Sequence, residues 1–302
     1  MIDLSVIILT FNEEIHIERC INSLLPVTNK IFIVDSYSTD RTLDIVDTHG
    51  ATVVQRKFIN QAEQFQWAID NLPFKSEWIM RLDADEYIEH SLQDEIKRKL
   101  VVLPNNVDGV YLNRKHIFYE KWIKYGGRYP LKMLRIWRYG KGRVEQRWMD
   151  EHILLPEGAK CVNFKGGFFD ANLKGISFFI DKHNLYATRE AVDILNNKYG
   201  LFTKDDSINM SNNHQAKLKR FLKNSIYSKL PIGFRAAFYF SFRYFLQLGF
   251  LDGSKGFVYH FMQGFWYRLL VDIKVYEIER VCKGDIVFMK KLLNKEYGID
   301  LR

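Results

Sequence analysis

The first half of the chain alternates short, almost entirely apolar runs with longer segments whose apolar residues recur at helical spacing. The run at 4–10 is rich in β-branched residues and nearly all apolar, as is typical of a strand that is buried on both faces of a parallel sheet. We expect such strands at residues 4–10, 30–35, 51–55 and 77–82. Because strands and helices alternate, the pattern predicts right-handed crossovers and a mostly parallel central sheet flanked by helices.

The segments between these strands carry the expected helices. Asn12 is placed to cap a first helix, whose apolar residues Ile15, Cys20, Ile21 and Leu24 would share one side. Further helices are expected from Arg41 and at residues 60–72, 91–102 and 177–197. Later strands are expected at 109–113 and 131–137, separated by basic, aromatic and glycine-rich loops that suit a substrate surface.

Three carboxylates stand at the point where the apolar run at 78–82 stops, namely Asp83, Asp85 and Glu86. On an extended backbone Asp83 and Asp85 would point to the same side, and Ala84 would face away. Asp35 ends another strand, and the carboxyl ends of parallel strands meet at one edge of a sheet, where ligands bind. Two such carboxylates suit Mg²⁺ or Mn²⁺, which complete their shell with phosphates and water. A helix cap followed by solvated acids is the simpler interpretation.

The ligand that this edge suits is a nucleotide diphosphate. A carboxylate such as Asp35 accepts hydrogen bonds from the imide N–H of uracil or from ribose hydroxyls. The sequence contains no G-x-x-x-x-G-K-[ST] and no G-x-G-x-x-G pattern, which argues against the common ATP and dinucleotide sites.

Three sequence blocks resemble one known family. Residues 5–14 (SVIILTFNEE), 34–42 (VDSYSTDRT) and 82–86 (LDADE) are similar in order, spacing and strand-end placement to the family 2 glycosyltransferases, which have the GT-A fold. Residues 182–184 (KHN), 249–253 (GFLDG) and 264–267 (GFWY) are similar to a bacterial branch that adds glucose or other sugars to lipopolysaccharide core. The resemblance implies a catalytic domain over 1–213, with a nucleotide-binding half to about 105 and an acceptor half over 106–213, followed by a helical region over 214–302.

The resemblance also implies roles for individual residues. The nucleotide pocket would be lined by Thr10, Phe11 and Glu13. Asp35 would bind the base, and Arg81 would contact the nucleotide. Asp83 would reach the ribose and the metal, and Asp85 would be the metal ligand. Family members invert the anomeric centre in a single displacement, with one carboxylate as the base.

The base is expected from Asp150 or Glu151, because a sugar hydroxyl becomes a good nucleophile only as its proton is removed. Glu151 aligns with the glutamate that closes a short motif in many relatives, and Asp150 is the alternative. The leaving diphosphate needs no acid when a metal absorbs its charge. An exposed Asp-Glu-His turn without a catalytic part is the other interpretation. His183 and Asn184 are candidates for acceptor contacts.

The net charge of +8 belongs to the tail of the chain. Residues 214–302 hold 16 Lys and Arg against 7 Asp and Glu, which leaves 28 against 29 for residues 1–213. Residues 231–270 hold 14 aromatic residues, with Arg235, Arg243 and Gln247 close together on a helical wheel. We expect residues 231–280 to form amphipathic helices broken at Gly253, with rings in the membrane interface and arginines on lipid phosphates.

Core packing is the alternative to a membrane surface for this tail. In that case its helices would pack as ordinary core on the catalytic domain or in a dimer. A nucleic acid partner is not expected, because the rings lie inside apolar helical runs and not on a polar surface between Lys and Arg.

The sequence as a whole predicts an inverting, metal-dependent hexosyltransferase. It would move a hexose from a nucleotide-diphosphate sugar, a UDP-sugar by preference, to a hydroxyl of a lipid-linked cell-envelope glycan. We expect it in the cytoplasm, peripheral to the inner membrane face, because we find no signal-peptide pattern, no spanning run and no paired cysteine spacing. A catalytically inert nucleotide-sugar or membrane-binding module is the alternative. The sugar, the acceptor and the oligomeric state are not predicted.

Overall fold

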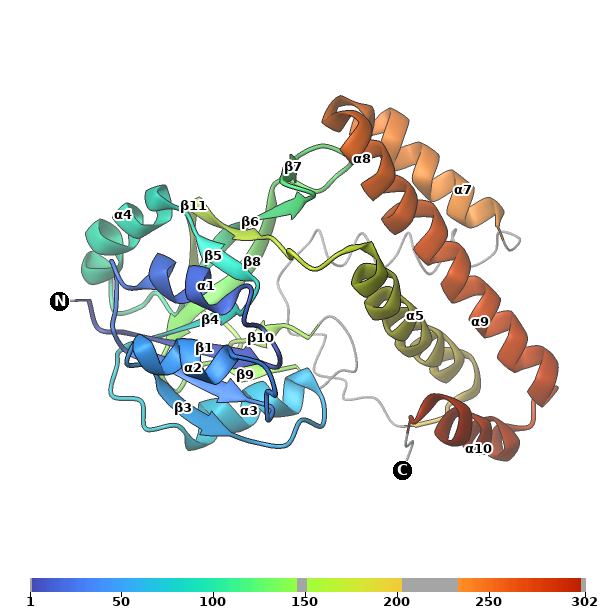
Figure 1. Cartoon of the computed structure of the whole chain (residues 1–302), viewed down its shortest axis with the longest axis horizontal. Helices are drawn as coiled ribbons and strands as arrows, with labels where there is room; N and C mark the ends of the chain where they lie inside the picture. Colours follow the sequence, from blue (N-terminus) through green and yellow to red (C-terminus); the bar gives the residue numbers. More distant parts are fainter. Residues whose placement is uncertain (1, 146–150, 203–232, 300–302) are drawn as a thin grey trace. The chain divides into compact units, whose positions relative to one another are not determined.

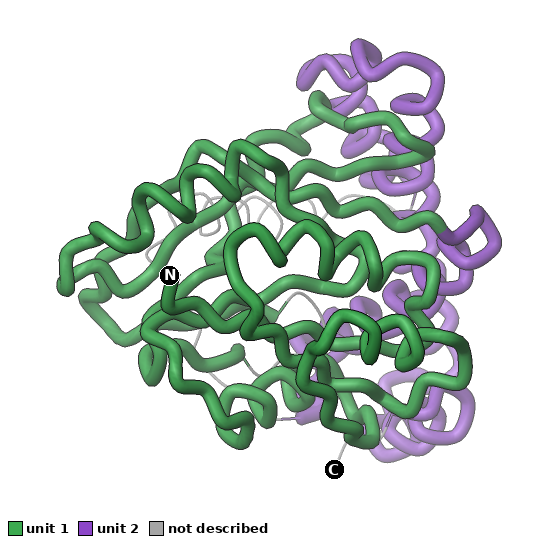
Figure 2. Tube along the Cα trace, turned by 60° about the vertical axis from the view of Figure 1, so that its left-hand side comes forward, with its two compact units in different colours: residues 1–173 green, residues 174–302 purple. Residues whose placement is uncertain are grey.

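The protein forms two compact units, residues 1–173 and 174–302, which Figure 2 shows in different colours. The structure is a computed structural model that describes residues 2–145, 151–202 and 233–299. The functional boundary expected between residues 213 and 214 lies outside these described residues and stays a prediction.

A nine-stranded sheet is the centre of the first unit, and its strand order is β3-β2-β1-β4-β8-β6-β11-β5, with β7 paired to β6. The strands are β1 (Leu4–Thr10), β2 (Ile31–Asp35), β3 (Thr52–Gln55), β4 (Trp78–Asp83), β5 (Glu86–Ile88), β6 (Gly109–Phe118), β7 (Lys121–Ile123), β8 (Leu131–Arg138) and β11 (Cys161–Asp170). Strands β3, β2, β1 and β4 are parallel, and β8 then pairs antiparallel with both β4 and β6. A separate two-stranded sheet joins β9 (Arg143–Val144) and β10 (Ile153–Leu154).

Helices cover both faces of the parallel strands, which explains why these strands are apolar at nearly every position. Val6 and Ile8 of β1 belong to the core with helices α1, α2 and α4, whereas Ile7 belongs to the core with α3 on the other face. The helices of this unit are α1 (Ile17–Leu24), α2 (Thr42–Thr48), α3 (Gln61–Asn71), α4 (His90–Lys99) and the short η1 (Leu100–Val102). Figure 1 shows them around the sheet.

The predicted cap at Asn12 is wrong. Helix α1 begins at Ile17, and Asn12 has a positive φ of 54°. Its side-chain oxygen accepts the N–H of Thr39 at 2.8 Å, and its own N–H donates to Ser38 Oγ at 2.9 Å. Asparagine tolerates this left-handed conformation better than most residues. Asn12 therefore joins the loop after β1 to the loop after β2.

The described residues of the second unit, 174–202 and 233–299, are largely helical. This unit contains α5 (Ile176–Tyr199), α7 (Phe234–Ser241), η4 (Phe242–Leu246), η5 (Gly249–Asp252), α8 (Gly253–His260), η6 (Phe261–Trp266), α9 (Tyr267–Cys282) and α10 (Ile286–Tyr297). Its main core joins α5, α9 and α10. The first tail helix ends at Leu246, and Leu248 then adopts a positive φ of 60°. The expected break at Gly253 is also present, because Gly253 has a positive φ of 74° between η5 and α8. Among the described residues, no helix is both long and apolar enough to cross a membrane.

The two tail arginines do not lie at an exposed rim, so that part of the tail prediction is wrong. Arg243 is 4% exposed, and Arg235 forms an ion pair with Asp272 of α9. The apolar residues that share one side of this helix are exposed, as a helix on a membrane surface requires. These residues along α7 and η4 are Phe234, Phe238, Phe242, Phe245 and Leu246, all between 39% and 74% exposed.

Candidate functional site

The carboxyl ends of three neighbouring parallel strands meet at one edge of the sheet. The register pairs Thr10 with Asp35 and Leu9 with Asp83, so the ends of β1, β2 and β4 lie side by side. This is the edge at which open α/β sheets bind ligands. The topology therefore brings the predicted residues Thr10, Asp35 and Asp83 to one place.

Asp35 is fully buried and holds the loop that follows β2. One of its carboxylate oxygens accepts from Thr10 Oγ1 at 3.1 Å and from the Ser38 hydroxyl. The other accepts the N–H of Ser38 at 2.9 Å and the Gln55 amide at 3.0 Å. Four hydrogen bonds to the carboxylate offset the free-energy cost of burying it. Its expected contact with a base stays a prediction.

The loop after β1 places Phe11 and Glu13 at the same edge. The Phe11 side chain is 55% exposed, which leaves its ring accessible to a ligand. Glu13 bonds to Nδ1 of the buried His16, and the N–H of Leu173 donates to Nε2 of that histidine at 2.8 Å. Because Nε2 accepts, the ring proton lies on Nδ1, and His16 donates it to Glu13. The carboxylate of Glu13 is thereby fixed in orientation.

The backbone does not stay extended through Asp85, so the strand alternation expected to align the two aspartates is wrong. Asp83 ends β4, and Ala84 and Asp85 form the turn that reverses the chain into β5. The reason lies far along the sequence: β5 pairs antiparallel with β11, with Glu86 opposite Asp170. A turn, and not strand alternation, therefore sets the position of Asp85.

Asp85 is partly exposed and is anchored to the end of the first unit. Its Oδ2 accepts from the Asn172 amide at 3.0 Å, and its main-chain oxygen accepts from Arg19 Nη2 at 3.2 Å and from the N–H of Ala171 at 3.2 Å. The described residues hold no group of three or more His, Cys, Asp or Glu placed for a metal. Magnesium needs only one or two protein carboxylates when substrate phosphates supply the rest. The partly exposed Asp83 and Asp85 fit that donor set.

Asp83 lies between two arginines. Arg81 Nε donates to its Oδ1 at 3.3 Å, and Arg135 Nη2 lies 3.8 Å from its Oδ2. Burial by itself would raise the pKa of Asp83, but Arg81, Arg135 and Arg114 outweigh it and lower that pKa. Asp83 is therefore ionised at neutral pH, as a ligand for a cation or for hydroxyl groups needs to be.

Arg81 also reaches the candidate base. Its Nη2 donates to Glu151 Oε1 at 2.7 Å, and the side chains of Arg81 and Glu151 are 7% and 8% exposed. Burial acts to lower the pKa of Arg81, yet the carboxylates of Asp83 and Glu151 raise it, so the guanidinium stays charged. The structure thus links Glu151 to the strand-end site. Asp150, the alternative base, lies outside the described residues.

Sequence reasoning missed the buried pair of Glu86 and Arg135. Arg135 Nη2 donates to Glu86 Oε1 at 2.6 Å, and Glu86 Oε2 accepts the N–H of Asp83 at 2.9 Å. The β6–β8 register shifts between Val110 and Tyr111, which leaves Arg135 as the extra residue of a bulge. The signal in the sequence was an arginine in the middle of the apolar residues 133–137 of β8. Burial raises the pKa of Glu86 to about 8, although Arg135 opposes that shift.

A second buried carboxylate, Asp170, ends β11 beside Glu86. Its Oδ2 accepts from Arg114 Nε at 2.9 Å and from His116 Nδ1 at 2.9 Å. Burial favours a higher pKa, but Arg114 and His116 hold the pKa of Asp170 well below its usual range. Because β11 pairs with both β5 and β6, Asp170 lies opposite Glu86, next to the turn that carries Asp85.

The two residues expected to contact an acceptor lie on α5 of the second unit. His183 is 8% exposed; its Nδ1 bonds to the main-chain oxygen of Phe179 at 2.7 Å and its Nε2 to the Gln263 amide at 2.5 Å. Asn184 is exposed. A role of either residue in acceptor binding stays a prediction, and His183 fits better as a satisfied polar group of the helical core.

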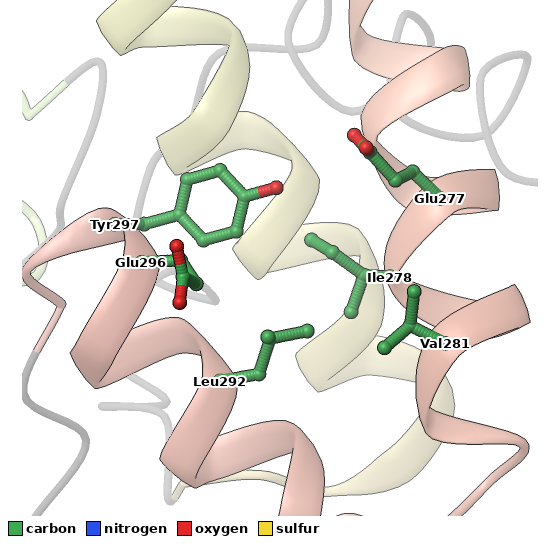
Figure 3. Close-up of a pocket in the computed structure, with 6 residues that line it drawn as sticks. All are labelled: Glu277, Ile278, Val281, Leu292, Glu296 and Tyr297. Atoms are coloured by element: carbon green, nitrogen blue, oxygen red, sulfur yellow. The ribbon is translucent and has the colours of Figure 1, made fainter.

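A separate pocket of about 250 Å³ lies between α9 and α10 in the second unit. Figure 3 shows its lining, which consists of Glu277, Ile278, Val281, Leu292, Glu296 and Tyr297. None of these residues belongs to the strand-end site. Two carboxylates without a cation among the lining residues make it poorly suited to a phosphate ligand.

Four parallel strands with a ligand edge, extended by antiparallel β8, define the GT-A class of nucleotide-diphospho-sugar transferase folds. The sequence matches the model of glycosyl transferase family 2 over residues 5–166, which is more than half of the chain. The chain therefore belongs to glycosyl transferase family 2.

Curated relatives agree with this family. An uncharacterized glycosyltransferase of Rickettsia bellii is 39% identical over 94 residues, which are 31% of this chain and 31% of that protein. The match thus spans about a third of the length of that relative. The lipopolysaccharide core biosynthesis glycosyltransferase LpsC of Rhizobium meliloti is 27% identical over 193 residues, covering 62% of this chain and 70% of that protein.

Solved structures give a weaker likeness. Glucosyl-3-phosphoglycerate synthase from Mycobacterium tuberculosis, in complex with Mn²⁺, UDP and glucosyl-3-phosphoglycerate, is 19% identical with a TM-score of 0.30. The match covers 37% of this chain and 43% of that one. A likeness of this size supports no conclusion about the ligands of this chain.

Proposed function

We propose that the protein is an inverting glycosyltransferase that moves a hexose from a nucleotide-diphosphate sugar, a UDP-sugar by preference, to a hydroxyl of a lipid-linked cell-envelope glycan. The observation that carries the proposal is the row of polar side chains at the carboxyl edge of the sheet. In a member of glycosyl transferase family 2, this edge gathers Asp35, Asp83, Asp85 and Glu151. The likeness to LpsC supports a lipopolysaccharide-core acceptor.

The donor would lie across the ends of β1, β2 and β4. The exposed Phe11 ring offers a flat apolar surface to a base, and Thr10, Glu13 and Asp35 line the pocket around the nucleoside. Asp83 would accept ribose hydroxyls. Asp85 and Asp83 would hold Mg²⁺ or Mn²⁺, which neutralises the charge of the leaving diphosphate when it is bound.

Glu151 is the proposed base in the transfer. The acceptor oxygen forms a bond to the anomeric carbon while the bond from that carbon to the diphosphate oxygen breaks, and the nucleoside diphosphate leaves with the electron pair. The acceptor proton passes to the carboxylate of Glu151. A positioned base of this kind contributes roughly 10²- to 10⁴-fold to the rate.

The exposed apolar face of the second unit supports contact with a membrane surface. Phe234, Phe238, Phe245 and Leu246 recur at helical spacing and are 56% to 74% exposed. Aromatic rings on one side of a helix suit the boundary between headgroups and acyl chains. Because Arg235 and Arg243 face the interior, attraction to lipid phosphates would rest on other residues, such as the exposed Lys255. The protein would then work at the inner face of the cell membrane.

Donor binding is the first test of this function. Thermal unfolding of the full chain is measured with UDP-, GDP- and dTDP-sugars, each with and without Mn²⁺. A ligand that binds only the folded protein at 100 times its Kd adds about 2.7 kcal/mol, so the right donor raises the midpoint by several degrees. We expect a rise with a UDP-sugar that depends on Mn²⁺ and is absent in Asp85→Ala. No rise with any donor would contradict the proposal.

A further inference from the structure

Arg81 joins two carboxylates that have different tasks in the proposed reaction. Its Nε bonds to Asp83, on the donor side, and its Nη2 bonds to Glu151, the proposed base. Asp83 ends β4 two residues after Arg81, whereas Glu151 lies 70 residues after Arg81. One planar guanidinium therefore sets the distance and the orientation between them.

The surroundings of Arg81 fix this guanidinium firmly. Its carbon lies 5.0 Å above the ring of Phe65, which is fully buried in α3. The β1–β4 register places the Arg81 backbone beside Ile7, and β4 is paired on both sides, with β1 and with β8. A bridge built on a rigid strand, with a ring beneath it, holds its partners more precisely than a loop could.

We propose that Arg81 is a positioning residue, which holds the carboxylate of Glu151 in place beside Asp83 so that the acceptor hydroxyl meets its base next to the donor sugar. This inference rests on the proposed function and gives Arg81 a task distinct from a contact with the nucleotide. A bidentate bridge needs an arginine, because the single ammonium of lysine lacks the planar fork.

The test is a double-mutant cycle on UDP release. Release is measured in the full chain with the UDP-sugar that stabilises the wild type most, in the presence of Mn²⁺. Arg81→Lys keeps the positive charge but removes the planar guanidinium, whose two nitrogens bond to Asp83 and Glu151. We expect it to lower kcat about 10- to 100-fold, since a small misplacement of a reacting group costs about that much. The Kd of UDP, measured by calorimetry, should change by less than about threefold.

The cycle is completed in a Glu151→Gln background. If Arg81 acts through Glu151, Arg81→Lys lowers kcat there by less than about threefold, because residues that work as a unit are strongly non-additive. Phe65→Leu loosens the guanidinium without removing a charge, and we expect a smaller loss of kcat that likewise disappears in the Glu151→Gln background. This second variant keeps the test available if Arg81→Lys does not fold.

Arg138→Lys is the matched control. Arg138 lies at the far end of the β4–β8 pair, stacks on Trp78 and pairs with Glu77, away from the site. The Arg138→Lys variant should leave kcat unchanged. An equal loss in both backgrounds, or a loss of UDP affinity at unchanged kcat, would overturn the inference and leave the proposed function intact. A wild type that releases no UDP from any donor would overturn the function itself.

Discussion

Arg135 donates to Glu86 across a distance of 2.6 Å, and the side chains of both residues are only 3% exposed. Glu86 in turn accepts the N–H of Asp83, so this buried pair supports the backbone of the strand-end site. Phe168 covers the guanidinium, with its ring centre 4.7 Å away. The pair therefore connects β8 to β5 and, through the N–H of Asp83, to the end of β4.

Removing one partner of this pair should destabilise the protein. Burial already raises the pKa of Glu86 to about 8, so in Arg135→Met the carboxyl group stays protonated, and the protein loses the hydrogen bond from the charged guanidinium, which contributes about 1.5–3 kcal/mol. The thermal midpoint should fall by roughly 3–12 °C on that basis. Glu86→Gln keeps an acceptor for the N–H of Asp83 and should cost much less. Equal losses in the two variants would contradict the assignment.

Asp170 gives the stability of the first unit a defined dependence on pH. Its folded pKa is lowered, so its ionised form stabilises the fold above the unfolded pKa of about 3.9, and this contribution is lost as the pH falls through the folded value. We expect Asp170→Asn to lower the thermal midpoint at pH 7. The difference from the wild type should persist to about pH 4 and shrink below it. A difference that has already vanished at pH 5 would contradict the lowered pKa.

Asn172 should support the metal-binding task proposed for Asp85. Its amide orients the Asp85 carboxylate from 3.0 Å, and losing such a support typically costs 10- to 100-fold in metal affinity. We expect Asn172→Ala to weaken binding of UDP with Mn²⁺ about tenfold or more in calorimetry, on the same basis. Binding of UDP alone should change little. Asn71→Ala, on exposed α3 surface, is the control and should have no effect.

The exposed apolar face makes a prediction about lipid. The double variant Phe238→Ser and Phe245→Ser removes two rings from it, each worth about 1.5–3 kcal/mol when fully buried. Cosedimentation with vesicles of phosphatidylcholine and phosphatidylglycerol should fall at least about tenfold on that scale. Phe288→Ser removes a ring of α10 that is 44% exposed, and this variant should bind as the wild type does. Undiminished sedimentation of the double variant would exclude this face as the lipid contact.

The sequence predicts the parallel half of the fold well, because strands that are buried on both faces appear in the sequence as nearly continuous apolar runs. The runs that end at Thr10, Asp35 and Asp83 are strands, and the acids at their ends meet at one edge. Local patterns were enough there, since each strand is recognisable without knowing its neighbour.

The errors concern features that distant partners decide. Asp85 lies in a turn because β5 pairs with β11, and its partner Asn172 is 87 residues away. The helical wheel placed Arg235 and Arg243 together but could not tell which side of the helix packs inward. The pairing of Arg135 with Glu86 depends on a bulge in β8, which leaves no periodic signal.

The most direct test of the account is the release of UDP from a UDP-sugar by the full chain in the presence of Mn²⁺. We predict that the wild type releases UDP, that Asp85→Ala abolishes release together with the thermal stabilisation by the donor, and that Glu151→Gln loses release by about 10²-fold or more while it keeps the stabilisation. Release that persists undiminished in both variants would contradict the assignment of the site. A protein that is stabilised by the donor but never releases UDP would be a binding module and not an enzyme.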